Sequence, residues 1–137
     1  MFTRFSPAAK RVLRAAEQAS RNHNHYYVGV GHVLLALIEE HDPQVEARLV
    51  ERGTQAAAVL AEIRRALGTG DDRSWEGILI TPRVRRVMAS AESAVDESGL
   101  VEPVQLFDAI AREDGGLAAD VLGRCSCDLA PARRQRA

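Results

Sequence analysis

The segment Val28–Glu40, which reads VGVGHVLLALIEE, constrains the fold of this chain more than any other feature. Its six consecutive apolar residues, Val33–Ile38, leave no polar face, so nearly every side of the segment must be buried. Leucine and alanine are good helix formers, and Gly29 and Gly31 mark the start of the segment. We therefore expect a short core helix rather than a strand. A helix that is apolar on all sides needs other helices packed around it.

A second segment of the same kind, Val104–Ile110, occupies an equivalent place in the second half of the chain. Ser6-Pro7 is a typical helix start, with a hydroxyl cap and proline at the first helical position, and Thr81-Pro82 repeats it. The apolar positions that follow also match. The pairs are Ala9 with Val84, Val12 with Val87, Leu13 with Met88, Ala16 with Ala91, Ala19 with Ala94 and, after a gap of two residues, Val33 with Leu106, Leu34 with Phe107, Leu37 with Ile110 and Leu49 with Leu122. This pattern indicates an internal duplication of a four-helix unit.

Capping residues predict the remaining helix boundaries in the first half. The first helix ends at Asn22–Asn24, and Asp42-Pro43 opens a third helix that stops at Gly53. Thr54 is the expected cap of a fourth helix, which Gly68 ends. The corresponding last helix of the second half has lost most of its apolar face, so we expect it to be short or frayed.

These patterns predict an all-α fold: one domain of two four-helix repeats, about eight helices, packed with pseudo-twofold symmetry. The first repeat covers residues 1–68 and the second covers residues 79–137. Residues 69–78 are polar and bounded by glycine, so they are predicted to be a linker, in which Trp75 tucks against a helix.

Composition excludes several classes of protein. A hydrophobic content of 46% with only 4% aromatic residues over 137 residues suits close-packed helices with a substantial core. The net charge of −1 gives no overall field that would attract nucleic acid or an anionic membrane. No apolar run approaches the roughly 20 residues that cross a bilayer, and no signal peptide is recognisable. We expect a cytoplasmic protein without nucleic acid or membrane partners.

We expect no metal, cofactor or catalytic residue. Cys125 and Cys127 form a C-x-C pair, but a structural zinc site needs two more ligands, so we expect ordinary reduced thiols. No Ser/His/Asp or Cys/His constellation is recognisable. The sequence also lacks a G-x-x-x-x-G-K-[ST] phosphate loop, so we expect no ATP hydrolysis by this chain itself.

Several short motifs occur in a characteristic order. They are Met1-Phe2, Arg4-Phe5 and Ser6 at the start, His25 and His32 in an H-x6-H pattern before LLALI, and Ile80-Thr81-Pro82-Arg83 at the second helix start. Together with the duplication, they resemble the Clp N-terminal (Clp-N) repeat domain, especially that of ClpC-type unfoldases, over essentially the whole chain. The resemblance implies a non-catalytic domain that captures peptides, adaptors or small cyclic-peptide ligands. Such a domain normally presents them to an attached ATPase ring, which is not found in this sequence.

ClpC-type domains carry a G-T-E-H motif in each repeat, and its glutamates help to recognise phosphorylated arginine. The corresponding segments here are Gly29-Val30-Gly31-His32, with Gly31 in place of glutamate, and Glu102-Pro103-Val104-Gln105, with Val104 in its place. A guanidinium would lose its charge-assisted partner in both sites. Ser6 and Thr81 keep a hydroxyl at a helix N-terminus, which could still attract a phosphate. We expect weak or absent phosphoarginine binding.

The resemblance also implies an apolar ligand-binding patch, where the start of the chain meets the start of the second repeat. The matching residues are Phe2, Ile80, Pro82 and Val84, flanked by Arg4, Arg83 and Arg86. An apolar centre with a basic rim suits a peptide or the acidic edge of an adaptor. In the alternative interpretation, Phe2 and Ile80 fill the core and the arginines form a solvated face.

The predicted function is that of a stand-alone Clp-N-like binding protein. It would act beside a ClpC-type unfoldase by sequestering or delivering shared substrates, adaptors or peptide-like toxins, including cyclic peptides. One alternative is the excised N-terminal docking domain of a full-length ClpC-type ATPase. A second is an enzyme that has taken over this scaffold, against which the missing catalytic constellation argues.

Overall fold

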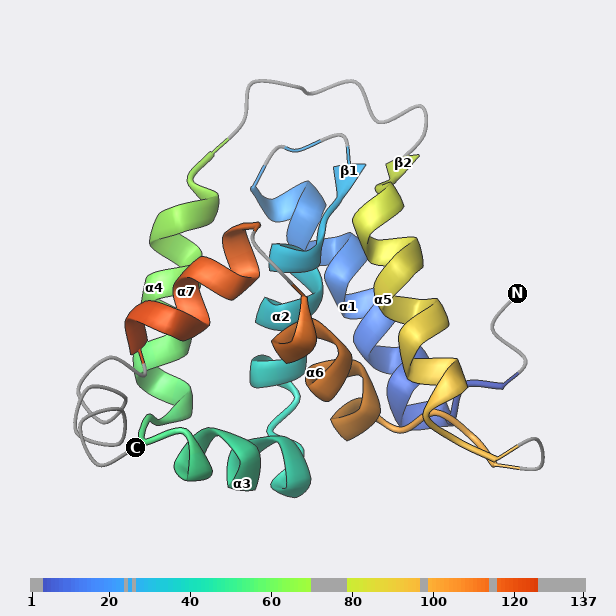
Figure 1. Ribbon diagram of the computed structural model, residues 1–137. Coiled ribbons are helices and arrows are strands. Elements are labelled where there is room, and N and C mark those ends of the chain that lie inside the picture. Colours follow the sequence, from blue (N-terminus) through green and yellow to red (C-terminus); the bar gives the residue numbers. More distant parts are fainter. Residues whose placement is uncertain are drawn as a thin grey trace.

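The computed structural model describes residues 4–23, 25, 27–69, 79–96, 99–113 and 116–125 of the chain. Within them the chain forms seven helices and two short strands (Figure 1). The elements are α1 (Pro7–Asn22), β1 (Tyr27–Val28), α2 (Val30–Glu39), α3 (Pro43–Glu51), α4 (Ala56–Leu67), β2 (Leu79–Ile80), α5 (Pro82–Ser93), α6 (Pro103–Arg112) and α7 (Leu117–Cys125). The predicted all-α fold class is confirmed.

Helix α2 is the central helix, as the sequence predicts. Its residues from Val30 to Ile38 are all buried, and α1, α4, α5, α6 and α7 contact it. The helix begins two residues later than predicted, because Val28 belongs to β1 and pairs with β2. Gly29 follows in an extended conformation and is the N-cap of α2.

Two equivalent backbone pairings join the halves of the molecule. Strands β1 and β2 are parallel, with Val28 opposite Ile80. At the other end of α1, Phe5 forms a parallel bridge with Val101. In each pairing, the residue before the first helix of one repeat meets a residue before the second helix of the other. Exchanging the two repeats exchanges the two pairings, as pseudo-twofold symmetry requires.

The first helix of each repeat is capped as predicted. Ser6 Oγ accepts a hydrogen bond from the Ala9 N–H at 3.1 Å, and Thr81 Oγ1 accepts one from the Val84 N–H at 3.3 Å. Proline follows both caps at the first helical position. The two helix starts are therefore alike in structure as well as in sequence.

The predicted cap of α4 is wrong. Its N-cap is Gln55, whose side chain makes no capping hydrogen bond. Thr54 is buried, and its N–H donates to the Leu49 carbonyl at 3.0 Å, so this residue completes the turn after α3 instead. Asp42 and Gly68 act as predicted: Asp42 caps α3 through its carboxylate, and Gly68 ends α4 with a φ of 58°.

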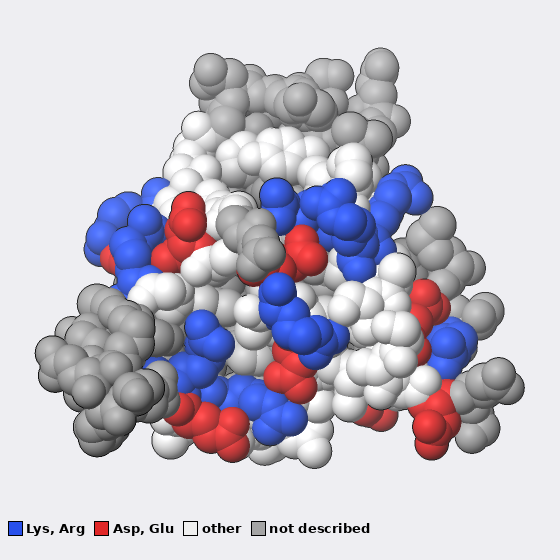
Figure 2. Space-filling view, in the orientation of Figure 1, with Lys and Arg blue, Asp and Glu red and all other residues white. Residues whose placement is uncertain are grey.

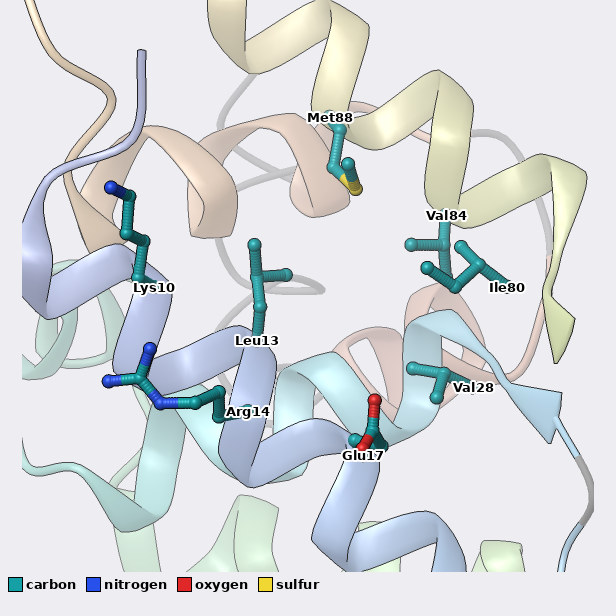
Figure 3. Close-up of a pocket in the computed structure, with 8 residues that line it drawn as sticks. All are labelled: Lys10, Leu13, Arg14, Glu17, Val28, Ile80, Val84 and Met88. Atoms are coloured by element: carbon teal, nitrogen blue, oxygen red, sulfur yellow. The ribbon is translucent and has the colours of Figure 1, made fainter. Parts of the chain in front are cut away.

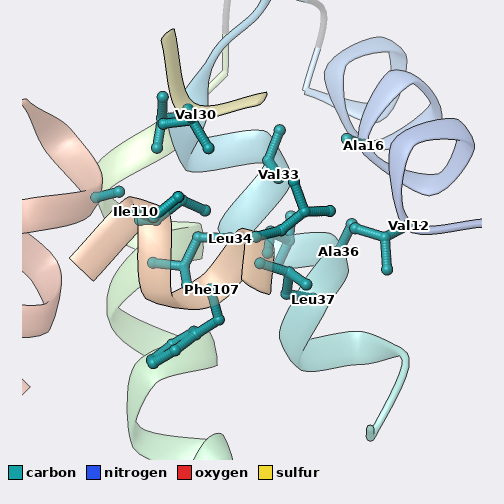
Figure 4. Packing of buried hydrophobic residues seen from close by; sticks show 14 of the residues in the cluster. Val12, Ala16, Val30, Val33, Leu34, Ala36, Leu37, Phe107 and Ile110 are labelled. Carbon is teal, nitrogen blue, oxygen red and sulfur yellow. The ribbon is translucent and has the colours of Figure 1, made fainter. Parts of the chain in front are cut away.

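The core packs α2 against its repeat equivalent, α6 (Figure 4). Leu34 and Leu37 of α2 and Phe107 and Ile110 of α6 are fully buried, and these are the residues that the duplication pairs. Burial of each such side chain is worth about 1.5–3 kcal/mol. Helices α1 and α5 cover this core on one side (Figure 1).

Some sequence predictions fall outside the described residues. They concern the last helix of the second repeat within 126–137, the segment 70–78 with Trp75, and Phe2. The division of the chain at residues 69–78 stays a prediction. Of the helices that the structure describes, none has the length and apolar character needed to span a membrane.

Candidate functional site

A groove lies between α1 and α5, the first helices of the two repeats (Figure 3). Its lining residues are Lys10, Leu13, Arg14 and Glu17 of α1, Val28 of β1, Ile80 of β2, and Val84 and Met88 of α5. We call this surface the α1–α5 groove. It has a volume of about 170 Å³, and most of its exposed lining is apolar.

The internal symmetry explains the position of the groove. Because β1 follows α1 and β2 precedes α5, the paired strands close one end of the gap between the two helices. Leu13 and Met88, which occupy equivalent positions in the two repeats, point toward each other across it (Figure 3). Leu13 remains half-buried, so this apolar side chain is accessible to a ligand.

The groove has a basic end and an apolar end. Lys10 and Arg14 lie at one end, away from Val28, Ile80 and Val84 (Figure 3). Neither cation forms an ion pair with any residue that the structure describes. Because the half-buried Lys10 and the exposed Arg14 have no carboxylate partner there, this end of the groove can attract an anionic group.

Among the described residues that line the groove, Glu17 is the one carboxylate, and its charge is already partly neutralised. Glu17 forms an ion pair with Arg21, one turn further along α1, with 3.1 Å between Oε1 and Nη1. The remaining lining charges, on Lys10 and Arg14, are both positive.

The structure brings two of the predicted patch residues into this groove. Ile80 and Val84 line it side by side. Ile80 is half-buried, packs against the core and also lines the groove. It therefore combines the two predicted roles, a ligand-binding residue and a core residue. Pro82 is exposed at the start of α5 and is not part of the lining, and Phe2 lies outside the described residues.

The three arginines of the predicted rim have different surroundings, and none of them lines the α1–α5 groove. Arg4 Nη2 donates to the Asp96 carbonyl at 2.7 Å, which ties the chain start to the end of α5. Arg83 forms an ion pair with Glu113 at 3.3 Å and lines a different pocket. Arg86 is exposed on α5.

The residues that sequence reasoning missed are Lys10, Arg14, Leu13, Val28 and Met88. Leu13 and Met88 were identifiable as an equivalent pair in the apolar stripes and were expected to face the core. Met88 is buried in the core and Leu13 packs against it, and both residues also line the groove, which the sequence did not predict. Helical spacing could have indicated the two cations, because Lys10 lies three residues before Leu13 and four residues before Arg14, and residues at these spacings are neighbours on a helix.

A second pocket lies at the start of α2. Its lining is Tyr27, Gly29, Val30, Gly31, His32, Leu67, Thr81, Arg83, Gly116 and Leu117. The structure thus brings Gly31 and Thr81, two of the predicted site residues, to one place. A Cβ atom added to Gly31 would lie 2.9 Å from Leu117 Cδ2 and 3.1 Å from Leu67 Cδ2. A side chain at this position would therefore have to displace the ends of these two leucine side chains.

Below this pocket, two buried histidines are hydrogen-bonded to each other. The Gly29 N–H donates to His32 Nδ1 at 2.9 Å, so the proton of neutral His32 is on Nε2. Nε2 then donates to His25 Nδ1 at 2.8 Å. Burial, and then the neighbouring His25, lower the pKa of His32 to about 4. Burial also lowers the pKa of His25. The pair holds the start of α2 in place.

Other chemistry has little support among the described side chains. His, Cys, Asp and Glu residues nowhere gather in a group of three that could hold a metal ion. His25 and His32 hydrogen-bond to each other rather than to a nucleophile, and the Cys125 thiol lies 3.8 Å from the Ala58 carbonyl. Cys127 lies outside the described residues.

The family model of the Clp repeat (R) N-terminal domain matches residues 4–101. The chain belongs to this family. It is 29% identical over 140 residues to the negative regulator of genetic competence ClpC/MecB of Bacillus subtilis (strain 168). It is 27% identical over 137 residues to the chaperone protein ClpB of Oceanobacillus iheyensis. Each match covers 98% of this chain but 17% of the relative, so the chain spans about a sixth of their length.

Solved structures show the same fold. The N-terminal domain of the caseinolytic protease associated chaperone ClpD from Arabidopsis thaliana superposes with a TM-score of 0.67 at 22% identity, and the match covers 99% of both chains. A chain from preliminary structural investigations of a malarial protein secretion system gives a TM-score of 0.71 at 18% identity and is matched over 93% of its length, with 97% of this chain covered.

The second motif segment of this Clp-N domain, Glu102-Pro103-Val104-Gln105, buries the residue that stands in place of the glutamate. Val104 is buried in the interior, with 5% of its surface exposed. The Glu102 N–H donates to Gln105 Oε1 at 2.7 Å, so Gln105 takes the place that His32 has in the first repeat. Ser6 lies next to this segment, because its N–H donates to the Val101 carbonyl at 2.9 Å, and its side chain is buried.

Proposed function

We propose that this chain is a non-catalytic Clp-N-like binding protein that captures or sequesters substrates, adaptors or peptide-like ligands of a ClpC-type unfoldase. Cyclic-peptide toxins belong to this ligand class, because their sequestration needs binding alone. The observation that carries the proposal is the α1–α5 groove. Concave, mostly apolar surfaces with a few polar groups are typical of binding sites. We place this activity in the cytoplasm.

The similarity to ClpC and ClpB supports a role in protein handling. Because the chain matches 17% of these relatives, the same docking role is compatible with an N-terminal part of a longer ClpC-type ATPase. In either case the groove, rather than a reaction centre, is the functional site. The reading frame in the genome distinguishes the two arrangements.

Phosphoarginine is not part of the proposed ligand class. Leu67 and Leu117 fill the space beside Gly31, and Val104 is buried in the core. A carboxylate is therefore missing from both positions that would pair with a guanidinium. Calorimetric titration with free phosphoarginine should give no measurable heat of binding, and tight binding would contradict this part of the proposal.

The test replaces an accessible apolar residue of the groove by a charge. In the variant Leu13→Asp, a carboxylate projects into the apolar gap between α1 and α5. Binding of labelled adaptor fragments, unfolded substrate peptides and a cyclic peptide to immobilised protein should be lost. Thermal melting, followed by circular dichroism, establishes that the variant is folded.

Val50→Asp is the matched control. Val50 lies on α3 and has 69% of its surface exposed, so the same charge is introduced far from the groove without loss of packing. This variant should bind as the wild type does. Equal binding by a folded Leu13→Asp variant and by Val50→Asp would show that the groove is not the site.

A further inference from the structure

We infer that the α1–α5 groove selects acidic ligands, and that its occupant is a peptide segment of a partner protein with apolar side chains and neighbouring carboxylates. This inference rests on the proposed function and specifies its ligand. The apolar residues would contact Leu13, Ile80 and Met88, and the carboxylates would face Lys10 and Arg14.

The first argument is the distribution of ion pairs. Most arginines outside the groove are neutralised: the pairs are Arg11–Glu40, Arg21–Glu17, Arg48–Asp108, Arg64–Glu39, Arg65–Glu62, Arg83–Glu113 and Arg124–Glu62. Seven described cations make no ion pair with a described residue: four lie on α1 or α5 (Lys10, Arg14, Arg85 and Arg86), and three lie elsewhere (Arg4, Arg52 and Arg112). Of these seven, Lys10 and Arg14 line the groove, where their charges are available to a ligand.

The surface view agrees with this distribution. Lys and Arg side chains gather over the start of α5, while elsewhere on this face they alternate with Asp and Glu (Figure 2). Two carboxylates limit the positive charge near the groove. Glu17 is paired with Arg21, and Glu92 lies one turn beyond Met88 on α5. Among the described residues that line the groove, Lys10 and Arg14 are therefore the charged side chains without an ion-pair partner.

The second argument is the relation between the cations and the apolar lining. Lys10 and Arg14 are one turn apart on α1, on either side of Leu13 along the helix. Because Leu13 faces Met88, an apolar ligand side chain in this gap lies next to the basic end of the groove, where a neighbouring ligand residue can reach Lys10 and Arg14 (Figure 3). A carboxylate next to the apolar anchor gains attraction, and a lysine there meets like charge.

The expected effect is moderate for each charge. An exposed ion pair changes affinity by about 2- to 5-fold, so reversal of both cations should change affinity for an acidic ligand by about 10-fold or more. Because salt screens exposed charges, the preference should weaken between 50 and 500 mM NaCl.

The experiment uses three fluorescein-labelled peptides with the same Leu-Phe-Leu centre, flanked on both sides by two Glu, two Gln or two Lys residues. Anisotropy titrations of the wild-type protein should rank the affinities Glu over Gln over Lys. Lys10→Glu/Arg14→Glu should reverse this order. Arg64→Glu/Arg65→Glu changes the net charge equally on α4, away from the groove, and should keep the wild-type order.

The possible results separate the inference from the proposed function. If the three peptides bind equally, or if Lys10→Glu/Arg14→Glu keeps the wild-type order, the inference is overturned. If Leu13→Asp nevertheless abolishes binding, the proposed function stands. If none of the peptides binds the wild type and Leu13→Asp leaves adaptor binding intact, both are overturned.

Discussion

The hydrogen-bonded pair His25 and His32 should make the stability of this domain depend on pH. His32 is fully buried, its Nδ1 accepts a hydrogen bond from the Gly29 N–H, and its Nε2 donates to His25. Protonation of His32 at Nδ1 would remove the acceptor that caps α2. The neutral form is therefore the one that the folded state stabilises.

The sign and size of the effect follow from the pKa of His32. The folded-state pKa is about 4, below the value of 6.5 for an unperturbed histidine. The unfolded chain therefore binds a proton first as the pH falls, and the stabilisation present above pH 6.5 is lost progressively between pH 6.5 and 4. Linkage gives a loss of about 2 kcal/mol in the free energy of unfolding by pH 5 and about 3 kcal/mol in full. His25, whose pKa is also lowered, acts in the same direction.

The second repeat supplies the variant that tests this. Gln105 occupies the position equivalent to His32, and its Oε1 accepts from the Glu102 N–H. His32→Gln should therefore keep the cap of α2 without a titrating group. We expect urea unfolding, followed by circular dichroism, to show a smaller stability loss between pH 7.5 and 5 in this variant than in the wild type.

His41→Gln is the control. His41 is exposed and its side chain hydrogen-bonds to Glu46, so this variant replaces a surface histidine by the same residue type and leaves the His25–His32 pair intact for comparison. If His32→Gln loses as much stability as the wild type between pH 7.5 and 5, the titrating group is not His32, and the assignment of its proton to Nε2 loses its support.

Three further predictions concern packing, the motif segment and helix capping. Leu37→Ala should lower the free energy of unfolding by about 2–5 kcal/mol, measured in urea, because it leaves a cavity in the fully buried core; a loss below 1 kcal/mol would contradict this packing. Gly31→Glu should melt at a lower temperature than the wild type, because the side chains of Leu67 and Leu117 must move to make room for the glutamate. The variant should also bind no phosphoarginine in calorimetric titration. An unchanged melting temperature together with tight phosphoarginine binding would contradict the packing of these two leucines against Gly31. Ser6→Ala should cost about 0.5–2 kcal/mol in urea unfolding through the lost cap of α1, and an unchanged midpoint would show that this hydrogen bond contributes nothing.

The helices could be predicted from the sequence because their signals are local. Ser6-Pro7 and Thr81-Pro82 fix two helix starts through side-chain caps, and helical spacing of apolar residues identifies the buried faces. The duplication then predicts that the equivalents Leu34 and Phe107 share one core. The sequence predicted Thr54 as the N-cap of α4 because a hydroxyl residue precedes the helix. The same sequence pattern occurs when the residue is buried in the turn after the preceding helix, as Thr54 is.

The groove could be predicted only in part, because its shape depends on tertiary packing. Tyr27–Val28 is too short for a periodic strand signal, and its conformation depends on a partner strand far along the chain. Leu13 and Met88 follow the same stripe as core residues, yet the separation of α1 and α5 leaves them facing a gap. Arg86 follows Val84 by two residues, and side chains two residues apart in a helix point to different sides, so Arg86 does not line the groove with Val84.

The most direct test of the account maps the ligand onto the structure. A nitrogen-15 NMR titration of the protein with the Glu-flanked peptide measures which backbone amides shift on binding. The account predicts the largest shifts at Leu13, Ile80, Val84 and Met88. Saturable shifts centred on Gly31, with no change at these four amides, would contradict it.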